Sequence, residues 1–190
     1  MPPLKEAESK IASETKIYNV ALESTAAAEF AKTAGVIISL FALVEGDPPL
    51  VLDKLGVISK EDARSILGVF RAFSNRIDLL KQVSLNRPEA SAERVCLSYY
   101  KGLFNEANII RNKYAHATYS IGRFPNGEWN MHLQIFSGDH NRKVERQIHS
   151  VTDFKADADR LKRIISELHA LCYRDEVPSG LHKQLQKLSP

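Results

Sequence analysis

The sequence is poor in cysteine and in excess charge of one sign. It has 190 residues, two cysteines and one tryptophan, and 26 Lys and Arg against 23 Asp and Glu give a net charge of +3. Cys96 and Cys172 are far apart in apolar helical patterns, which indicates reduced core thiols in a cytoplasmic protein rather than a disulfide framework or a cysteine zinc site. So small a charge excess does not mark a protein that binds nucleic acid or a membrane surface. Any RNA hypothesis therefore depends on particular residues.

Targeting segments and common catalytic motifs are also lacking. The N-terminal lead, residues 1–12, has no basic and apolar regions of a signal peptide, and the longest apolar run, Ala34 to Val44, is far below the roughly 20 residues that span a bilayer. We therefore expect no membrane partner. A Gly-rich phosphate loop, an H-E-x-x-H motif and a nucleophile elbow are absent. The histidines without a metal-ligand spacing are His132, His140, His149, His169 and His182, so no metal and no cofactor is expected.

Helical periodicity covers most of the chain. Apolar residues recur at spacings of three and four, the pattern of helices with one buried face. The expected helices span residues 13–44, 59–85, 88–117 and 153–173, with a short one at 50–55. Ser59 with Asp62 resembles a capping box at a helix start. In the first two long helices the residues expected to face the core include Ala28, Ala31, Ile38, Phe41, Ile66, Val69, Phe73 and Ile77.

One segment changes its period from 3.6 to 2. Trp129, Met131, Leu133 and Ile135 alternate with polar residues, which indicates a strand. Pro125-Asn126-Gly127 is a turn signal, residues 119–124 are the expected partner strand, and a third strand is indicated near 143–150. The sequence therefore predicts a mainly all-α fold: one domain, residues 1–190, forming an up-and-down helical bundle with a β-hairpin insertion at about 119–150 before its last long helix. Residues 175–190 are expected to form a mobile tail.

The string that carries chemistry lies at the end of the helix expected at 88–117. Arg111-Asn112-Lys113-Tyr114-Ala115-His116 contains an Arg, an Asn directly after it, and a His five positions beyond the Arg. It resembles the R-N-x-x-x-H motif of the HEPN superfamily, whose members are small helical bundles that pair as dimers. Many are metal-independent endoribonucleases in toxin, antiphage and RNA-processing systems. Two other Arg–His spacings, starting at Arg163 and Arg142, lack the Asn.

The resemblance implies a role for each polar residue of the string. Arg111 would bind the scissile phosphate through two N–H donors. His116, a group whose ordinary pKa is about 6.5, would take the 2′-hydroxyl proton or give one to the leaving oxygen. Asn112 would orient His116 or the phosphate. The residues that would guide the RNA backbone are Lys113, Tyr119, Arg142, Lys143 and Arg146.

Three asparagines share one face of the same helix. The residues on this face, at spacings of three and four, are Lys101, Asn105, Asn108, Asn112 and His116. Because Asn is a poor helix former, its repetition indicates contacts outside the helix, to a polar ligand or across a dimer. Arg111 lies roughly 140° around the helix from His116, so one helix does not bring the two together. The family places two motifs across a two-fold axis, which implies a homodimer with a composite cleft.

Three functional hypotheses result. The first is a cytoplasmic homodimer that cleaves RNA with Arg111 and His116, in a toxin or antiphage setting, with an antitoxin or other protein as partner. The second is a noncatalytic HEPN-like module whose asparagine face binds a nucleotide, RNA or a protein. The third is a helical scaffold whose hairpin recruits a protein. From the residues alone, two structural alternatives without catalysis stay open. Arg111 could be an ion-pair partner of Asp78, and His116 could be a positive charge favoured by the negative end of the helix dipole.

Overall fold

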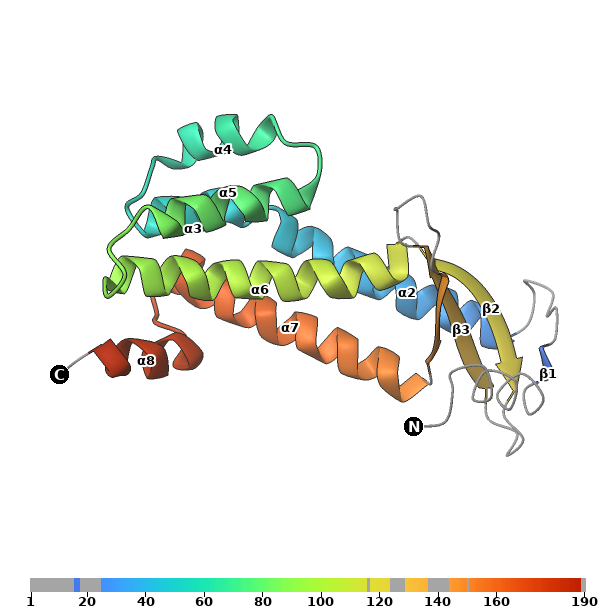
Figure 1. The fold of residues 1–190 in the computed structure, drawn as a ribbon. Coiled ribbons are helices and arrows are strands. Elements are labelled where there is room, and N and C mark those ends of the chain that lie inside the picture. The colour runs from blue at the N-terminus through green and yellow to red at the C-terminus, as the bar shows by residue number, and fades with distance from the viewer. Residues whose placement is uncertain are drawn as a thin grey trace, which may run out of the picture. The chain divides into compact units, whose positions relative to one another are not determined.

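The structure, a computed structural model, is mostly helical. It describes residues 16–17, 25–115, 117–123, 129–136, 144–149 and 151–188, with side chains for 28–115 and 152–188. The described helices are α2 (Thr25–Glu45), α3 (Pro48–Lys54), α4 (Lys60–Gly68), α5 (Phe73–Leu85), α6 (Ala92–Ala115), α7 (Val151–Arg174), α8 (Ser179–Leu185) and the short η1 (Gln186–Leu188), as Figure 1 shows. The mainly α fold predicted from the periodicity is confirmed.

Within the described ranges, strand pairing forms one antiparallel sheet. Its order is β1 (Lys16–Ile17), β2 (Ala117–Arg123), β3 (Trp129–Phe136) and β4 (Val144–His149). In β2 and β3, Tyr119 lies opposite Leu133, and in β3 and β4, Gln134 lies opposite Arg146. The turn predicted at Pro125-Asn126-Gly127 lies outside the described residues. The hairpin as a continuous insertion therefore stays a prediction.

The chain divides into two compact units. The first consists of Met1–Ile38 and Asn112–Ala158 and contains the sheet, and the second consists of Ser39–Arg111 and Asp159–Pro190. Helices α2, α6 and α7 each continue from one unit into the other. Because three helices run through both units, this division neither confirms nor contradicts the prediction of a single domain over residues 1–190.

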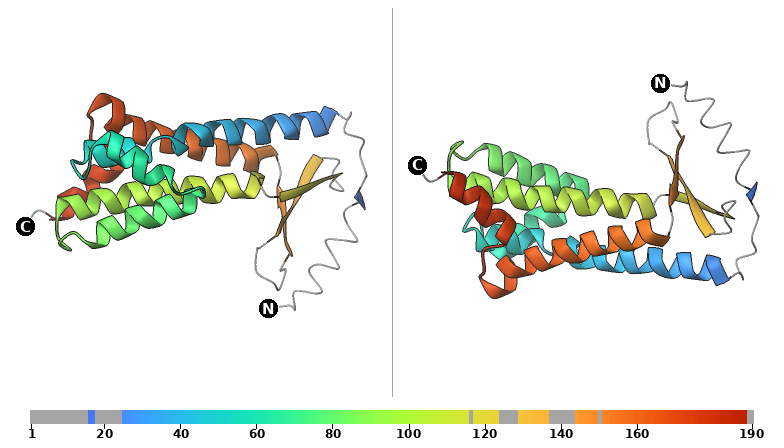
Figure 2. Two further views of the ribbon diagram at one scale, coloured as in Figure 1. Left: turned by 90° about the horizontal axis from the view of Figure 1, so that it is seen from above. Right: turned by 90° about the horizontal axis from the view of Figure 1, so that it is seen from below.

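The core of the second unit is built on aromatic contacts. Helices α5 and α6 run antiparallel and side by side (Figures 1 and 2). The ring of Phe73 on α5 packs edge-on against Phe41, with centroids 5.1 Å apart, and against Phe104, with centroids 6.0 Å apart. Burying each such side chain contributes about 2 kcal/mol. The hydroxyls of Ser84 and Ser98, 2.9 Å apart, satisfy each other where the two helices meet.

The helix predicted over residues 59–85 is wrong as a single element. Its start is correct, because the Ser59 hydroxyl accepts a hydrogen bond from the Asp62 backbone N–H at 3.2 Å. However, α4 ends at Gly68 and α5 begins at Phe73. Glycine is a poor helix former, so ending the helix at this position costs little.

The break also shifts which residues of α4 face inward. Ile66 and Val69, predicted as core, are 45% and 76% exposed, whereas Ala63 and Leu67 are buried. The apolar pattern over residues 59–85 thus combines the patterns of two separate helices. Phe73 and Ile77, on the second of them, are buried as predicted.

The first predicted helix, residues 13–44, is corrected at its start. Lys16–Ile17 pair with β2 as strand β1, and the described part of α2 begins at Thr25. The predicted Phe41 is buried, at 4% exposed, but the predicted Ile38 is 42% exposed and its neighbour Ile37, at 0% exposed, faces the core instead. Ala28 and Ala31 are exposed too. Small residues lie on several faces of α2, so they do not define its orientation, which the larger side chains set.

The predicted tail beyond residue 175 contains structure. Helix α8 buries Leu181, which is 2% exposed, and Gly180 approaches Tyr99 of α6 so closely that a Cβ would lie 2.4 Å from the Tyr99 hydroxyl oxygen. The tail prediction is therefore wrong over Ser179–Leu185. A helix of seven residues is too short for periodicity to identify.

Both cysteines are free thiols, as predicted. Cys172 is buried and Cys96 is half-buried. Burial raises the pKa of the Cys172 thiol to about 12, with a further rise from nearby Asp47. At neutral pH this thiol is protonated and acts as a small apolar side chain.

One stretch of the described chain is apolar enough to cross a membrane by length and composition. It covers 27 residues, Ala28–Lys54, and is longer than the run from Ala34 to Val44 on which the sequence expectation was based. Of its most apolar window, 39% is buried within the protein. The core helix of a soluble protein passes the same test, so this stretch does not decide between a membrane-spanning helix and a core helix.

Candidate functional site

The motif string occupies the last turn of α6. Tyr114, at 2% exposed, marks the buried side of this turn. Arg111, Asn112 and Lys113 are half-buried. His116 follows the last residue of α6 and lies outside the described residues. The structure therefore positions the helical part of the motif, and the role of His116 stays a prediction.

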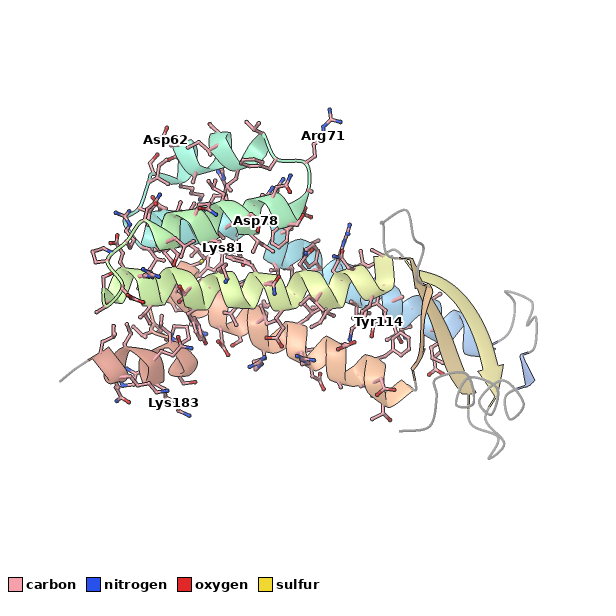
Figure 3. The ribbon with its side chains drawn as sticks, viewed as in Figure 1. Asp62, Arg71, Asp78, Lys81, Tyr114 and Lys183 are labelled. Atoms are coloured by element: carbon pink, nitrogen blue, oxygen red, sulfur yellow. The ribbon has the colours of Figure 1, made fainter. Side chains whose placement is uncertain are left out.

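The guanidinium of Arg111 lies over an aromatic ring. Its central carbon is 5.8 Å from the ring centroid of Phe41 on α2. A contact of this kind contributes about 0.5–2 kcal/mol, and it holds the charge near an apolar surface without neutralising it. Arg111 has other interactions as well. Asp78, the ion-pair partner suggested by the sequence, is exposed on α5 (Figure 3).

Tyr114 joins the motif turn to α7. Its hydroxyl donates a hydrogen bond to the carboxylate of Asp157, with 2.7 Å between the oxygens, and its side chain points from α6 toward α7 (Figure 3). Both residues are buried, at 2% and 5% exposed. The Lys113 ammonium lies 3.4 Å from the same carboxylate oxygen. A neutral donor and a cation thus offset the cost of burying this charge.

Aromatic packing surrounds this hydrogen bond. Phe154, one helical turn before Asp157, is 0% exposed. Its ring centroid lies 5.2 Å from that of Tyr114 and 5.4 Å from that of Phe30. Each buried ring contributes about 2 kcal/mol or more of apolar burial. Within the first unit, the last turn of α6 is therefore held by both packing and a charge-assisted hydrogen bond.

Sequence reasoning missed Asp157. Phe154, Ala158 and Leu161 mark the buried face of α7, and Asp157 falls on that face. An acid at an inward position of an amphipathic helix is a signal of a buried polar contact. The partner could not be inferred, because Tyr114 lies 43 residues away.

The asparagine face of α6 is partly exposed. Asn105 is exposed, whereas Lys101, Asn108 and Asn112 are half-buried. Ile109 on the adjoining side is 53% exposed. This part of the helix therefore offers amide donors and acceptors next to an apolar side chain.

The second Arg–His spacing, Arg163 to His169, lies in an ion-pair network. The guanidinium groups of Arg163 and Arg160 on α7 lie 3.1 Å and 2.9 Å from the Glu106 carboxylate on α6. His169 packs edge-on against Tyr173, with ring centroids 4.9 Å apart. Arg163 thus takes part in exposed ion pairs between α6 and α7, and it also lacks the Asn that follows Arg111 in the motif.

The other residues expected to contact RNA are described only by their backbone or not at all. Tyr119 lies in β2 and Arg146 in β4, and their side chains are outside the described part of the chain. Arg142 and Lys143 also lie outside it. Their contacts with RNA stay predictions.

Neither a metal site nor a known relative identifies the chemistry of this turn. In the ranges that the structure describes, no group of three or more His, Cys, Asp or Glu side chains is placed to hold a metal ion. Comparisons with known protein families, with characterised proteins and with solved structures find no match to this chain.

Proposed function

We propose that this chain is a HEPN-like helical protein that cleaves RNA as a homodimer, without a metal ion. The observation that carries the proposal is the string Arg111 to His116 at the end of α6. The turn before His116 is held by the hydrogen bond from Tyr114 to Asp157. A rigid turn directly before a catalytic residue favours catalysis, because the side chains of the site then need less ordering to reach the transition state.

Each motif residue has a chemical task in this proposal. The 2′-oxygen forms a bond to phosphorus while the bond from phosphorus to the 5′-oxygen breaks, leaving a 2′,3′-cyclic phosphate and a 5′-hydroxyl. Arg111 binds the phosphate oxygens and their developing charge. His116 takes the 2′-hydroxyl proton or supplies one to the leaving oxygen. Asn112, one turn before His116, orients it or the phosphate.

A homodimer follows from helix geometry and the family resemblance. On an ideal helix, residues at the spacing of Arg111 and His116 are roughly 140° apart. A second copy related by a two-fold axis brings its own motif opposite, so that the two motifs form one composite cleft. The proposed oligomer is therefore part of the active site.

The remaining predicted contacts fit this scheme with one change. Lys113 is paired with Asp157 at 3.4 Å, so its first task is to stabilise the turn, and it reaches RNA only by leaving that partner. Tyr119 and the predicted hairpin insertion, about 119–150, are proposed as an arm that contacts RNA, the second subunit or an antitoxin. The proposed setting is a cytoplasmic toxin or antiphage system.

The test in cells requires no guess about the substrate. Wild type and His116→Ala are produced at matched protein levels, and total RNA is examined for fragments. Fragmentation with wild type alone supports the proposal. Equal fragmentation with both proteins would exclude His116 as the proton-transfer group.

A second candidate, a noncatalytic module, is favoured by the asparagine face. Exposed Asn105 lies on the same helix as Ile109, which is 53% exposed, a combination suited to contact with a partner. This candidate predicts RNA or protein binding without turnover. Binding would fall on Asn105→Ala or Asn108→Ala, while Arg111→Gln would leave it unchanged.

A further inference from the structure

An open surface hollow of about 430 Å³, called the cavity below, lies along one face of α7 in the second unit. Its lining residues are Lys162, Ile165, Ser166, His169, Tyr173 and Arg174. None of them belongs to the R-N-x-x-x-H string. The volume lies in the range of small-molecule sites, which is about 300–1,000 Å³.

The positive charges of this cavity are held only by exposed partners. Arg174 folds back along α7, where its guanidinium donates to the Ser166 carbonyl oxygen at 3.3 Å. Its Nε lies 3.5 Å from Glu176, and the Lys162 ammonium lies 3.0 Å from Asp159. All four charged side chains are more than half exposed. Exposed ion pairs contribute little, so an anionic ligand can replace either acid.

An aromatic wall adjoins the charges. The rings of His169 and Tyr173 meet edge-on at 79°, with centroids 4.9 Å apart. Tyr173 is 61% exposed, and Ile165, at 9% exposed, supplies an apolar floor. The free face of an aromatic ring at such a position stacks with a flat ligand ring.

A buried acid fixes this wall. Asp47, at the junction of α2 and α3, is 2% exposed and accepts a hydrogen bond from the Tyr173 hydroxyl. Its second oxygen, Oδ2, has no hydrogen-bond partner among the described residues. The carboxylate therefore restrains the ring of Tyr173.

We propose that this cavity binds a small organic anion that carries a flat aromatic ring. The ring stacks on Tyr173 above Ile165. The phosphate or carboxylate meets the Arg174 guanidinium and the Ser166 hydroxyl, and Lys162 adds further positive charge. Phosphate monoesters and carboxylates share this chemistry, so the probes must separate them.

Titration calorimetry on the full chain tests the proposal with four probes. AMP and benzoate each carry a ring and an anion, whereas adenosine and inorganic phosphate each carry one half of that chemistry. We expect saturable binding of AMP or benzoate, at least about tenfold tighter than either half, because hydrogen bonds to charged groups and ring stacking each contribute at that level. Whichever anion binds more tightly identifies the headgroup.

Three exposed substitutions provide the variants and the control. Arg174→Gln and Lys162→Gln should each weaken binding about tenfold, and Lys81→Gln on α5, outside the cavity, should not. Circular dichroism confirms that each variant is folded. The proposal is overturned if neither AMP nor benzoate binds saturably, or if phosphate or adenosine binds as tightly as AMP. It is also overturned if Arg174→Gln and Lys162→Gln weaken binding no more than Lys81→Gln does.

Discussion

The hydroxyl of Tyr114 and the carboxylate of Asp157 meet at 2.7 Å in a buried position. Through this contact the helix that carries Arg111 and Asn112 is joined to α7, next to the ring of Phe154. The residue before Tyr114 supplies the positive charge that balances the carboxylate. The motif string thus contains both the residues proposed for chemistry and those that hold the turn in place.

Breaking this hydrogen bond should destabilise the fold. Tyr114→Phe removes the donor and leaves the buried carboxylate with Lys113 as its other partner among the described residues. We expect a loss of about 1.5–3 kcal/mol in the free energy of unfolding, measured in urea. Asp159→Asn, at a side chain that is 71% exposed, serves as control and should change stability by less than about 0.5 kcal/mol. A Tyr114→Phe protein as stable as wild type would contradict the role assigned to the bond.

The contact of α8 with α6 gives a prediction with an internal control. Gly180→Ala places a methyl group 2.4 Å from the Tyr99 hydroxyl oxygen, which hydrogen-bonds Glu167. We expect a loss of about 1–3 kcal/mol, because Tyr99 must move and break that bond. Gly102→Ala, where nothing lies within 4 Å, should instead gain about 0.5–1 kcal/mol. Equal effects of the two substitutions in thermal unfolding would rule out the packing described for α8.

Asp47 should make stability depend on pH. Burial raises its pKa to about 6, although the charge of His169 and the hydrogen bond from Tyr173 lower it. The folded state then binds this proton more tightly than the unfolded state, whose pKa is near 4. Asp47 therefore costs roughly 2 kcal/mol of stability above about pH 6, and the cost disappears as the pH falls toward 4.

Comparison with Asp47→Asn isolates this contribution. The Asn variant should exceed wild type in stability at about pH 7.5, and the gap should narrow by about pH 4.5. Urea unfolding at both pH values measures the gap in stability, with Asp78→Asn at an exposed position of α5 as control. A gap that stays constant with pH would show that Asp47 does not titrate as described.

Helix order and most inward faces followed from the sequence because they depend on local periodicity. Phe154, Leu161 and Leu168, spaced seven residues apart, fall on one face of α7 and are buried. The same reasoning failed at Val69, where two helices were joined into one pattern. It also failed at Ile38, because alanines and glycine around it do not fix the phase of α2.

The candidate site could be predicted only where its residues are consecutive. Arg111, Asn112 and Lys113 form a recognisable string, but Phe41 and Asp157 come from helices far away in the sequence. Contacts across such separations depend on tertiary packing, which a single sequence without an alignment does not encode in any local pattern. The contact of Asp47 with Tyr173 was not predicted for the same reason.

The composite cleft predicts complementation between inactive subunits. Arg111→Gln and His116→Ala homodimers should each lose at least about 100-fold in RNA cleavage. Mixed dimers, formed by coexpression with two affinity tags, should recover activity well above either parent, because one cleft then holds an Arg and a His from different subunits. Mixed dimers as inactive as their parents would show that the two residues do not act across subunits.

The most direct measurement of the central claim is cleavage of a labelled single-stranded RNA by the purified chain in the presence of EDTA. Wild type should produce fragments with 2′,3′-cyclic phosphate ends. His116→Ala should cut at least about 100-fold more slowly while keeping the same circular dichroism spectrum and oligomeric mass. No cleavage by wild type, or equal cleavage by His116→Ala, would contradict the account.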